Sequence, residues 1–247
     1  MSLALHEISE ADHRILNPFT QEKLMTLGAV SRVGPSTRIL DLACGKGELL
    51  CRWARAFGAR GLGVDLSAVF LAAASSRAQE LGVVDQVTFH QGDAGDYSAE
   101  PAAYNLVSCL GATWIGGDLV GTIALMRKAA APDGLLLVGE PFWIDPPPAQ
   151  VYDALGCAPD EFTSLAGLHD RFEAAGTDLV EMVLADGDSW DRYVAAQWWT
   201  LTQWLQANRD DARATQVRAF RDDARRAHLS FGRRYLGWGV FVLRLPG

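Results

Sequence analysis

The sequence predicts an α/β fold, a doubly wound sheet in which helices cover both faces of mostly parallel strands. Strand-like and helix-like blocks alternate from residue 37 onward, residues 38–48 place a glycine-rich turn between an apolar strand and a helix, and residues 135–139 are almost entirely apolar. Alternation of this kind is typical of parallel sheets, and a continuous apolar run is typical of a strand covered on both faces. The chain of 247 residues, 49% hydrophobic and 21% charged, is long enough for one such domain with an insertion.

The first half of the chain supplies five strands and the helices that connect them. After an N-terminal segment with a helical stretch, helices are expected at residues 48–57, 68–81 and 119–131, the last ended by Pro132 and Gly134. The strands are expected at residues 37–42, 61–65, 87–91, 104–109 and 135–139. Ligands of such sheets bind beyond the carboxyl ends of the strands, so the residues that follow the strands form the candidate site.

The second half is expected to contain a helix at 160–175 and strands at 179–185 and 238–245. Residues 188–236 between these strands are an insertion of two helices, the first beginning at Asp188 or Ser189, because apolar residues recur there at helical spacing. Five of the eight tryptophans lie between residues 190 and 238, and the insertion is interpreted either as a packing element or as a substrate lid. We therefore divide the chain into an N-terminal helical flap (1–36), a sheet domain (37–187 with 237–247) and a helical insertion (188–236).

The turn after the first strand indicates the ligand. Gly45 and Gly47 let the backbone approach a ligand closely, and the next helix presents free N–H groups at its start. The dinucleotide pattern G-x-G-x-x-G is not met, because neither reading frame has its third glycine. The spacing Asp41-x-Ala43-x-Gly45-x-Gly47 resembles motif I of the class I S-adenosylmethionine (SAM) dependent methyltransferases, with Ala43 in place of the first glycine. A carboxylate at this turn suits the cationic SAM and would repel a pyrophosphate.

Two further acidic residues close the second and third strands. Asp65 could accept both hydroxyls of a ribose, and Asp93 could accept an adenine amino group while the Ala94 N–H meets a ring nitrogen. Acids at the ends of strands one, two and three resemble the class I pattern over residues 37 to about 145. The resemblance implies SAM as the cofactor. The cofactor-binding residues are then Asp41, Ala43, Cys44, Gly45, Gly47, Asp65, Leu66, Ser67, Asp93, Ala94, Cys109 and Leu110.

The resemblance extends over nearly the whole chain. It implies a seven-stranded sheet of order 3-2-1-4-5-7-6 with strand 7 antiparallel, interrupted by the helical insertion between strands 6 and 7. The segments His13–Phe19, Gly111–Gly117 and Gly139–Trp143 are similar to those of a group of uncharacterised bacterial class I methyltransferases. This group implies the fold and the cofactor but no substrate.

Residues just beyond strands four and five are expected to face the methyl group. Glu140 is the first candidate, because a carboxylate there could hold a cationic substrate or accept a proton, although a structural carboxylate is an equal alternative. Trp114 and His169 complete the candidate catalytic set, and His169 is also explained as an ordinary helix histidine. The candidate substrate residues are Asn17, Phe19, Thr113, Trp114, Trp143, Tyr193 and Trp198.

The composition of the chain limits the kinds of partner, compartment and metal that we expect. The net charge of -8 argues against general binding to nucleic acid or anionic lipid, which favours a small-molecule acceptor with an N, O or S nucleophile over RNA or protein. No apolar run of about 18 residues and no leader-like start are found, so we expect a cytoplasmic protein, a monomer or a homodimer. The histidines are scattered and the cysteines form no C-x-x-C pair, so no metal is expected. A SAM-binding protein without transfer activity is a rival, and an NAD-dependent oxidoreductase, opposed by the missing glycine and by Asp93, is a weaker one.

Overall fold

The computed structural model describes residues 2–246 and divides into two compact units. The sheet unit comprises Thr20–Glu140, Ala166–Leu184 and the residues from Gly239 onward. The helical unit comprises the residues up to Phe19, Pro141–Leu165 and Ala185–Trp238. Each unit has its own packed interior and is described by itself.

The sheet has seven strands in the order β3-β2-β1-β4-β5-β7-β6, which confirms the predicted fold class and strand order. The pairs β3–β2, β2–β1, β1–β4 and β4–β5 are parallel, and β7 is antiparallel to β6. The strands are β1 (Arg38–Leu42), β2 (Arg60–Asp65), β3 (Val87–Gln91), β4 (Tyr104–Leu110), β5 (Ala130–Trp143), β6 (Asp178–Leu184) and β7 (Leu236–Arg244).

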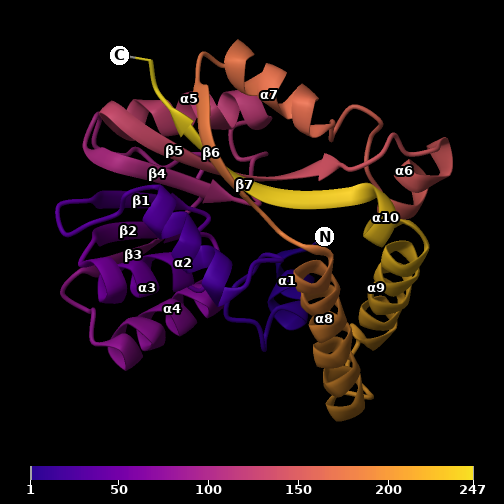
Figure 1. Cartoon of the computed structure of the whole chain (residues 1–247). Coiled ribbons are helices and arrows are strands. Elements are labelled where there is room, and N and C mark those ends of the chain that lie inside the picture. Colours follow the sequence, from indigo (N-terminus) through magenta and orange to yellow (C-terminus); the bar gives the residue numbers. More distant parts are fainter. Residues whose placement is uncertain (1, 247) are drawn as a thin grey trace. The chain divides into compact units, whose positions relative to one another are not determined.

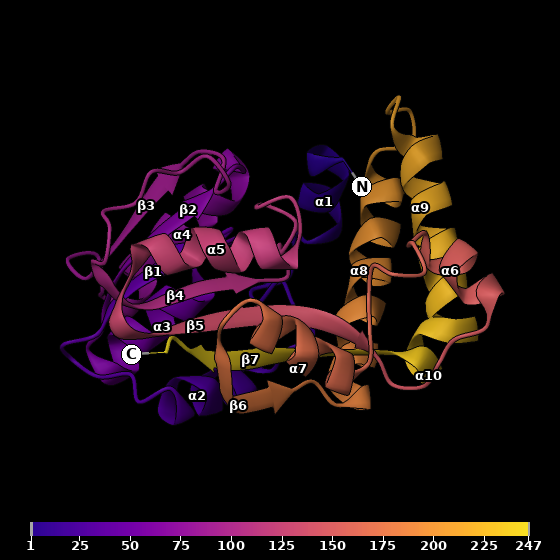
Figure 2. The same ribbon diagram turned by 90° about the horizontal axis from the view of Figure 1, so that it is seen from above.

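Helices cover both faces of this sheet. Helices α2 (Gln21–Val30), α3 (Glu48–Phe57) and α4 (Ala68–Leu81) lie on one face, and α5 (Leu119–Ala129) and α7 (Leu165–Ala174) lie on the other (Figures 1 and 2). The central strands are accordingly buried on both sides, and Leu136, Leu137 and Val138 have no exposed surface. The continuous apolar run at residues 135–139 therefore predicted the position of its strand correctly.

The packing of α2 on α3 shows how the sheet unit is closed on one side. The indole N–H of Trp53, which is fully buried, donates to the carbonyl oxygen of Leu24 at 3.0 Å. A Cβ on Gly28 would lie 2.8 Å from the same indole nitrogen, so only glycine allows the two helices to approach this closely.

The helical unit is built from α1 (Leu3–Ser9), α6 (Ala149–Leu155), α8 (Gly187–Ala207), α9 (Ala214–Ala227), a π-helical turn η1 (His228–Gly232) and α10 (Arg233–Tyr235). Helices α8 and α9 lie side by side (Figures 1 and 2). The apolar core shared by α1, α8 and α9 consists of Leu5, Leu201, Leu205, Ala214 and Val217. None of the helices within residues 2–246 combines the length and the apolar character needed to cross a bilayer.

Several predicted boundaries were wrong. The helix expected from residue 160 begins only at Leu165, because Trp143 donates its backbone N–H to the Thr163 carbonyl oxygen at 2.8 Å and so pairs the preceding segment with the end of β5. Strand β5 is longer than predicted at both ends: it starts at Ala130, which pairs with Tyr104 of β4, and it runs on to Trp143, which pairs with the segment before α7. Helix α6 was not predicted, and α8 is capped by Asp186, whose carboxylate accepts the Ser189 N–H at 2.8 Å, rather than by residue 188 or 189.

Candidate functional site

The chain leaves β1 through a turn that requires unusual backbone angles. Residues 43, 45 and 47 all have positive φ, at 57°, 53° and 65°. A Cβ on Gly47 would lie 2.6 Å from the Phe89 ring, so this position accepts only glycine. The glycines of the motif therefore allow the backbone angles of the turn. Because they have no side chains, they also leave the turn's backbone accessible to a ligand.

Ala43 is the one residue of this turn that carries a side chain in a left-handed conformation. The left-handed conformation costs a non-glycine residue about 1–2 kcal/mol. Glycine avoids this cost, but it gives back part of the gain because its unfolded chain has more conformational entropy. We expect Ala43→Gly to raise the free energy of unfolding by up to about 1 kcal/mol, measured in urea, with SAM affinity unchanged. The control is Ala72→Gly on the exposed side of α4, which should lower stability by about 1 kcal/mol. A loss of stability in Ala43→Gly would contradict this account.

Asp65 holds the turn in place from the end of β2. Its Oδ2 accepts the Gly45 N–H at 2.7 Å, and its Oδ1 accepts the Ser67 N–H at 2.8 Å. Ser67 in turn caps α4 by accepting the Phe70 N–H at 3.1 Å. Because a carboxylate offers about four lone-pair sites, Asp65 retains the capacity to accept ribose hydroxyls.

Asp41 is a buried acid beside the same turn. Its Oδ1 accepts the Ser108 hydroxyl at 2.6 Å. Burial raises the pKa of Asp41 to about 7, the charge of Asp65 adds to the rise, and the Ser108 hydrogen bond opposes it. Neither Asp41 nor Asp65 forms an ion pair with any residue from 2 to 246. Buried carboxylates without a cation beside them fit a positively charged ligand.

The other predicted cofactor residues line the same edge of the sheet. The parallel register sets Leu42 beside Cys109 and Asp65 beside Gln91, so the loops after β1 to β4 emerge together. Asp93 is exposed and its Oδ1 accepts the Gly95 N–H at 2.8 Å. Of the remaining positions, Ala94 and Cys109 are buried, Leu110 is half-buried and Leu66 is exposed. Burial, followed by the charges of Asp41 and Asp65, raises the pKa of the Cys44 thiol well above its usual value.

Glu140 and Thr113 meet at the next position along the edge. Both side chains are buried, and the Thr113 hydroxyl donates a short hydrogen bond to Glu140 Oε2. The register of β4 and β5 pairs Leu110 with Gly139, which brings Glu140 beside the loop that follows β4. Trp114, in the same loop, is 69% exposed and therefore available to a ligand.

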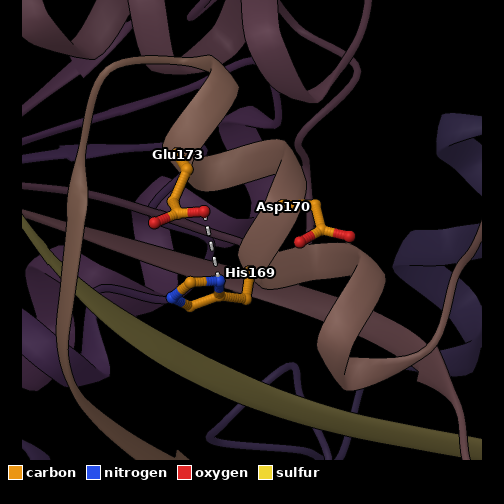
Figure 3. A group of neighbouring side chains, drawn as sticks. All are labelled: His169, Asp170 and Glu173. Carbon is orange, nitrogen blue, oxygen red and sulfur yellow. Dashed lines mark ion pairs between the residues drawn. The ribbon is translucent and has the colours of Figure 1, made fainter.

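His169 lies elsewhere on the sheet unit, on the exposed side of α7 (Figure 3). Its Nδ1 is 3.7 Å from a carboxylate oxygen of Glu173 on the same helix. Together with Asp170 these residues could offer three ligand atoms within 4.8 Å of one another, but all three are exposed, as is common for surface charges without a metal. The structure does not bring His169 together with Glu140 and Thr113.

The remaining predicted substrate residues belong to the helical unit. Tyr193 donates its hydroxyl to the fully buried Glu10 at 2.6 Å, and burial, followed by the Glu10 charge, raises the pKa of Tyr193 well above its usual value. The Trp198 ring meets the His228 ring at 6.0 Å. Both aromatic side chains therefore already have partners inside the unit.

The other three candidates, Asn17, Phe19 and Trp143, also belong to the helical unit. The Phe19 ring meets Trp238 edge to face at 5.1 Å, and half-buried Asn17 accepts the Phe19 N–H through its carbonyl oxygen at 2.7 Å. Trp143 is buried, and its ring packs against Tyr152 and Phe162 at 5.7 and 5.6 Å. A role for these residues toward substrate stays a prediction.

The sequence reasoning missed two groups of polar residues. Ser108 could have been found, because it is a hydroxyl residue among apolar neighbours in β4. The pairing of His228 with Asp191, at 2.8 Å between Nε2 and Oδ1, joins positions 37 residues apart and leaves no local signal. Asp191 also accepts from Arg233 at 2.8 Å, and the two partners hold its pKa below the usual value.

Comparisons with known proteins agree with this geometry. Residues 39–134 match a protein family described as a methyltransferase domain. A SAM-dependent methyltransferase from Geobacter sulfurreducens, crystallised with S-adenosylhomocysteine (SAH), is 47% identical and covers 99% of each chain with a TM-score of 0.95. Another from Thiobacillus denitrificans, also with SAH, is 44% identical and covers 100% of this chain and 99% of its own, with a TM-score of 0.94. The uncharacterised protein YjhP of Escherichia coli is 47% identical over 238 residues, 96% of each chain.

The doubly wound sheet and the acid-lined glycine turn define a Rossmann-like enzyme of the methyl-transferring class. The chain belongs to the class I SAM-dependent methyltransferases, and its cofactor is SAM. The residues at the strand ends fit this cofactor, because the turn presents bare backbone and the two buried carboxylates have no ion-pair partner in the described part of the chain.

Proposed function

We propose that this methyltransferase acts on an N, O or S nucleophile of a small molecule and that Glu140, held by Thr113, faces the methyl acceptor. The observation that supports the proposal is the buried carboxylate of Glu140, which lies in β5 just past the last residue that pairs with β4, on the same edge as Asp41 and Asp65. When bound, SAM supplies a methyl group on a positively charged sulfur, which an incoming lone pair can take.

The residues of the chain would act mainly by orientation and by excluding water. Glu140 would hold a cationic amine through a charge-assisted hydrogen bond, or would take the proton of a hydroxyl or thiol as it attacks. The hydroxyl of Thr113 fixes the direction of that carboxylate. Asp65 would accept the ribose hydroxyls, and Asp41 would lie near the amino-acid ammonium group, which SAM, SAH and sinefungin share.

A small acceptor is favoured by the charge of the chain. A net charge of -8 opposes approach to a polyanion such as RNA. A protein acceptor stays the alternative, and an acceptor panel that includes peptides distinguishes the two. The roles predicted for the flap (1–36) and the lid (188–236), the monomeric or dimeric state and the cytoplasmic location stay predictions.

The position of Glu140 can be tested without knowing the acceptor. Sinefungin resembles SAH but carries an amine where SAM carries its methyl group, so a carboxylate facing the acceptor should bind it preferentially. We expect the wild-type enzyme to bind sinefungin at least about tenfold more tightly than SAH in calorimetry. Glu140→Gln should reduce this ratio to about one while leaving SAH affinity within about twofold.

The control variant is Glu100→Gln, which removes an exposed carboxylate whose partner is Arg38, and it should keep the wild-type ratio. Once an acceptor is found by mass spectrometry of SAH in a panel of amines, hydroxy compounds and thiols, Glu140→Gln should reduce turnover more than SAM affinity. A wild-type ratio near one would refute the proposed position of Glu140.

A further inference from the structure

We infer that Thr122, on α5, is a positioning residue that sets the direction of Glu140 through the loop Gly111–Asp118. The inference rests on the proposed role of Glu140 and adds a residue that does not itself reach the acceptor. It concerns the sheet unit alone, since α5, the loop and Glu140 all belong to it.

The side chain of Thr122 makes two hydrogen bonds to this loop. Thr122 has no exposed surface, and its Oγ1 donates to the carbonyl oxygen of Thr113 at 2.6 Å. The same oxygen accepts the N–H of Gly116 at 2.9 Å. Thr113 then donates through its own hydroxyl to Glu140. An unbroken series of hydrogen bonds therefore runs from α5 through the loop to the carboxylate.

The loop packs closely against α5 at its Gly116 end. A Cβ on Gly116 would lie 2.3 Å from the backbone carbon of Gly121, and a Cβ on Gly121 would lie 2.2 Å from the Gly116 oxygen. Asp118 also ties the loop to the helix by accepting the Gly121 N–H at 2.7 Å. Backbone contact therefore holds the Gly116 end. At the other end Gly111 donates its N–H to the Gly139 carbonyl oxygen at 2.9 Å, and Thr122 holds the Thr113 carbonyl oxygen between these two points.

Near Ile115 the loop is held by a second contact that does not involve Thr122. A Cβ on Gly95 would lie 2.4 Å from the carbonyl oxygen of Ile115, so the loop presses directly on the segment that carries Asp93. Loss of the Thr122 hydroxyl should therefore disturb the Thr113 end and leave the Asp93 end in place. Glu140 would lose its fixed direction while the cofactor side of the site is retained.

The test compares sinefungin and SAH affinities, measured by calorimetry, in Thr122→Val and Thr122→Ser. The valine variant keeps the shape of threonine but loses both hydrogen bonds, and we expect its sinefungin preference to fall from about tenfold to about threefold or less with SAH affinity within twofold. The serine variant keeps the hydroxyl and should keep the full preference. Thr88→Val, at an exposed position of β3, is the matched control and should resemble wild type.

The outcomes separate the inference from the proposed function. A full preference in Thr122→Val, together with its loss in Glu140→Gln, would overturn the role of Thr122 and leave that of Glu140 standing. Equal weakening of both ligands in Thr122→Val would make Thr122 merely structural and would also overturn the inference. A wild-type ratio of sinefungin to SAH affinity near one would overturn the role of Glu140 and, with it, the role of Thr122. If the valine variant does not fold by circular dichroism, Thr122→Cys, with its weaker donor, replaces it under the same criteria.

Discussion

Replacing Asp41 by asparagine should make the ligand-free enzyme more stable and its SAM complex weaker. The asparagine keeps a hydrogen-bonding group beside Ser108 and removes a buried charge. At pH 8 we expect Asp41→Asn to be more stable than wild type by about 2–4 kcal/mol in urea unfolding, since one pKa unit corresponds to about 1.4 kcal/mol. SAM affinity should fall by about tenfold or more, because a charged hydrogen-bond acceptor is lost.

The pH dependence follows from the direction of the shift. The pKa of Asp41 is raised from 3.8 to about 7 in the folded protein, so between these values the folded state keeps a proton that the unfolded chain releases. The contribution of Asp41 to stability is therefore largest at low pH and is lost as pH rises from about 4 to about 7. Binding has the opposite sign, since a cationic ligand favours the ionised carboxylate, and wild-type affinity should rise with pH up to about 7 and then level off.

Urea unfolding and calorimetric titration with SAM, each carried out from pH 5.5 to 8.5, measure the stability and the affinity profile, and Asp41→Asn should remove the Asp41 component from each. Ionisation of the ligand itself appears equally in the two proteins and cancels in their difference. Asp85→Asn removes a charge from an exposed position and should leave both profiles unchanged. Identical affinity profiles in Asp41→Asn and wild type would show that Asp41 does not respond to the charge of SAM.

Asp65→Ala should reduce SAM affinity by at least about a hundredfold. The substitution removes the acceptor for the Gly45 and Ser67 N–H groups as well as the predicted acceptor for the ribose. Leaving buried N–H groups unpaired costs about 1–3 kcal/mol each, so the glycine turn should lose its shape before the ligand arrives. Calorimetry with SAM and SAH gives the affinity, and backbone amide chemical shifts of residues 43–47 report on the turn.

Asp93→Ala is the matched comparison, because Asp93 is exposed and, within residues 2–246, the Gly95 N–H is the one backbone donor to its carboxylate. We expect it to weaken SAM binding by about tenfold or less and to leave the amide shifts of the turn unchanged. Equal losses in the two variants would mean that Asp65 acts only through the ligand and not through the turn.

The fold could be predicted from sequence because its signals are local. The central strands of the sheet unit contain short apolar runs, and turn residues mark their ends, as the three leucines between Gly134 and Val138 show. The errors arose where a partner distant in sequence decides the structure. Residues 160–164 precede a helical pattern and were assigned to it, but Thr163 and Ser164 pair with the end of β5 instead.

The acids of the candidate site could also be predicted from the sequence, but the hydrogen bonds between its side chains could not. Asp41, Asp65 and Asp93 lie at or just after the carboxyl ends of three neighbouring parallel strands, so their shared edge follows from the order of the strands. The contact of Thr113 with Glu140 joins positions 27 residues apart and depends on the register of β4 and β5. No pattern in the chain indicates that Thr122 would bond both Thr113 and Gly116, because such contacts depend on loop geometry.

The elevated pKa of Cys44 bears on whether SAM could alkylate this thiol. SAM is an alkylating agent, and a thiolate is the most nucleophilic group that a side chain offers at neutral pH. Cys44 belongs to the very turn that is expected to carry the donor, yet burial and the adjoining carboxylates keep its sulfur protonated. The acids that suit a cationic methyl donor thereby also keep the thiol of their own turn in its protonated form, which is the less reactive form toward an alkylating agent.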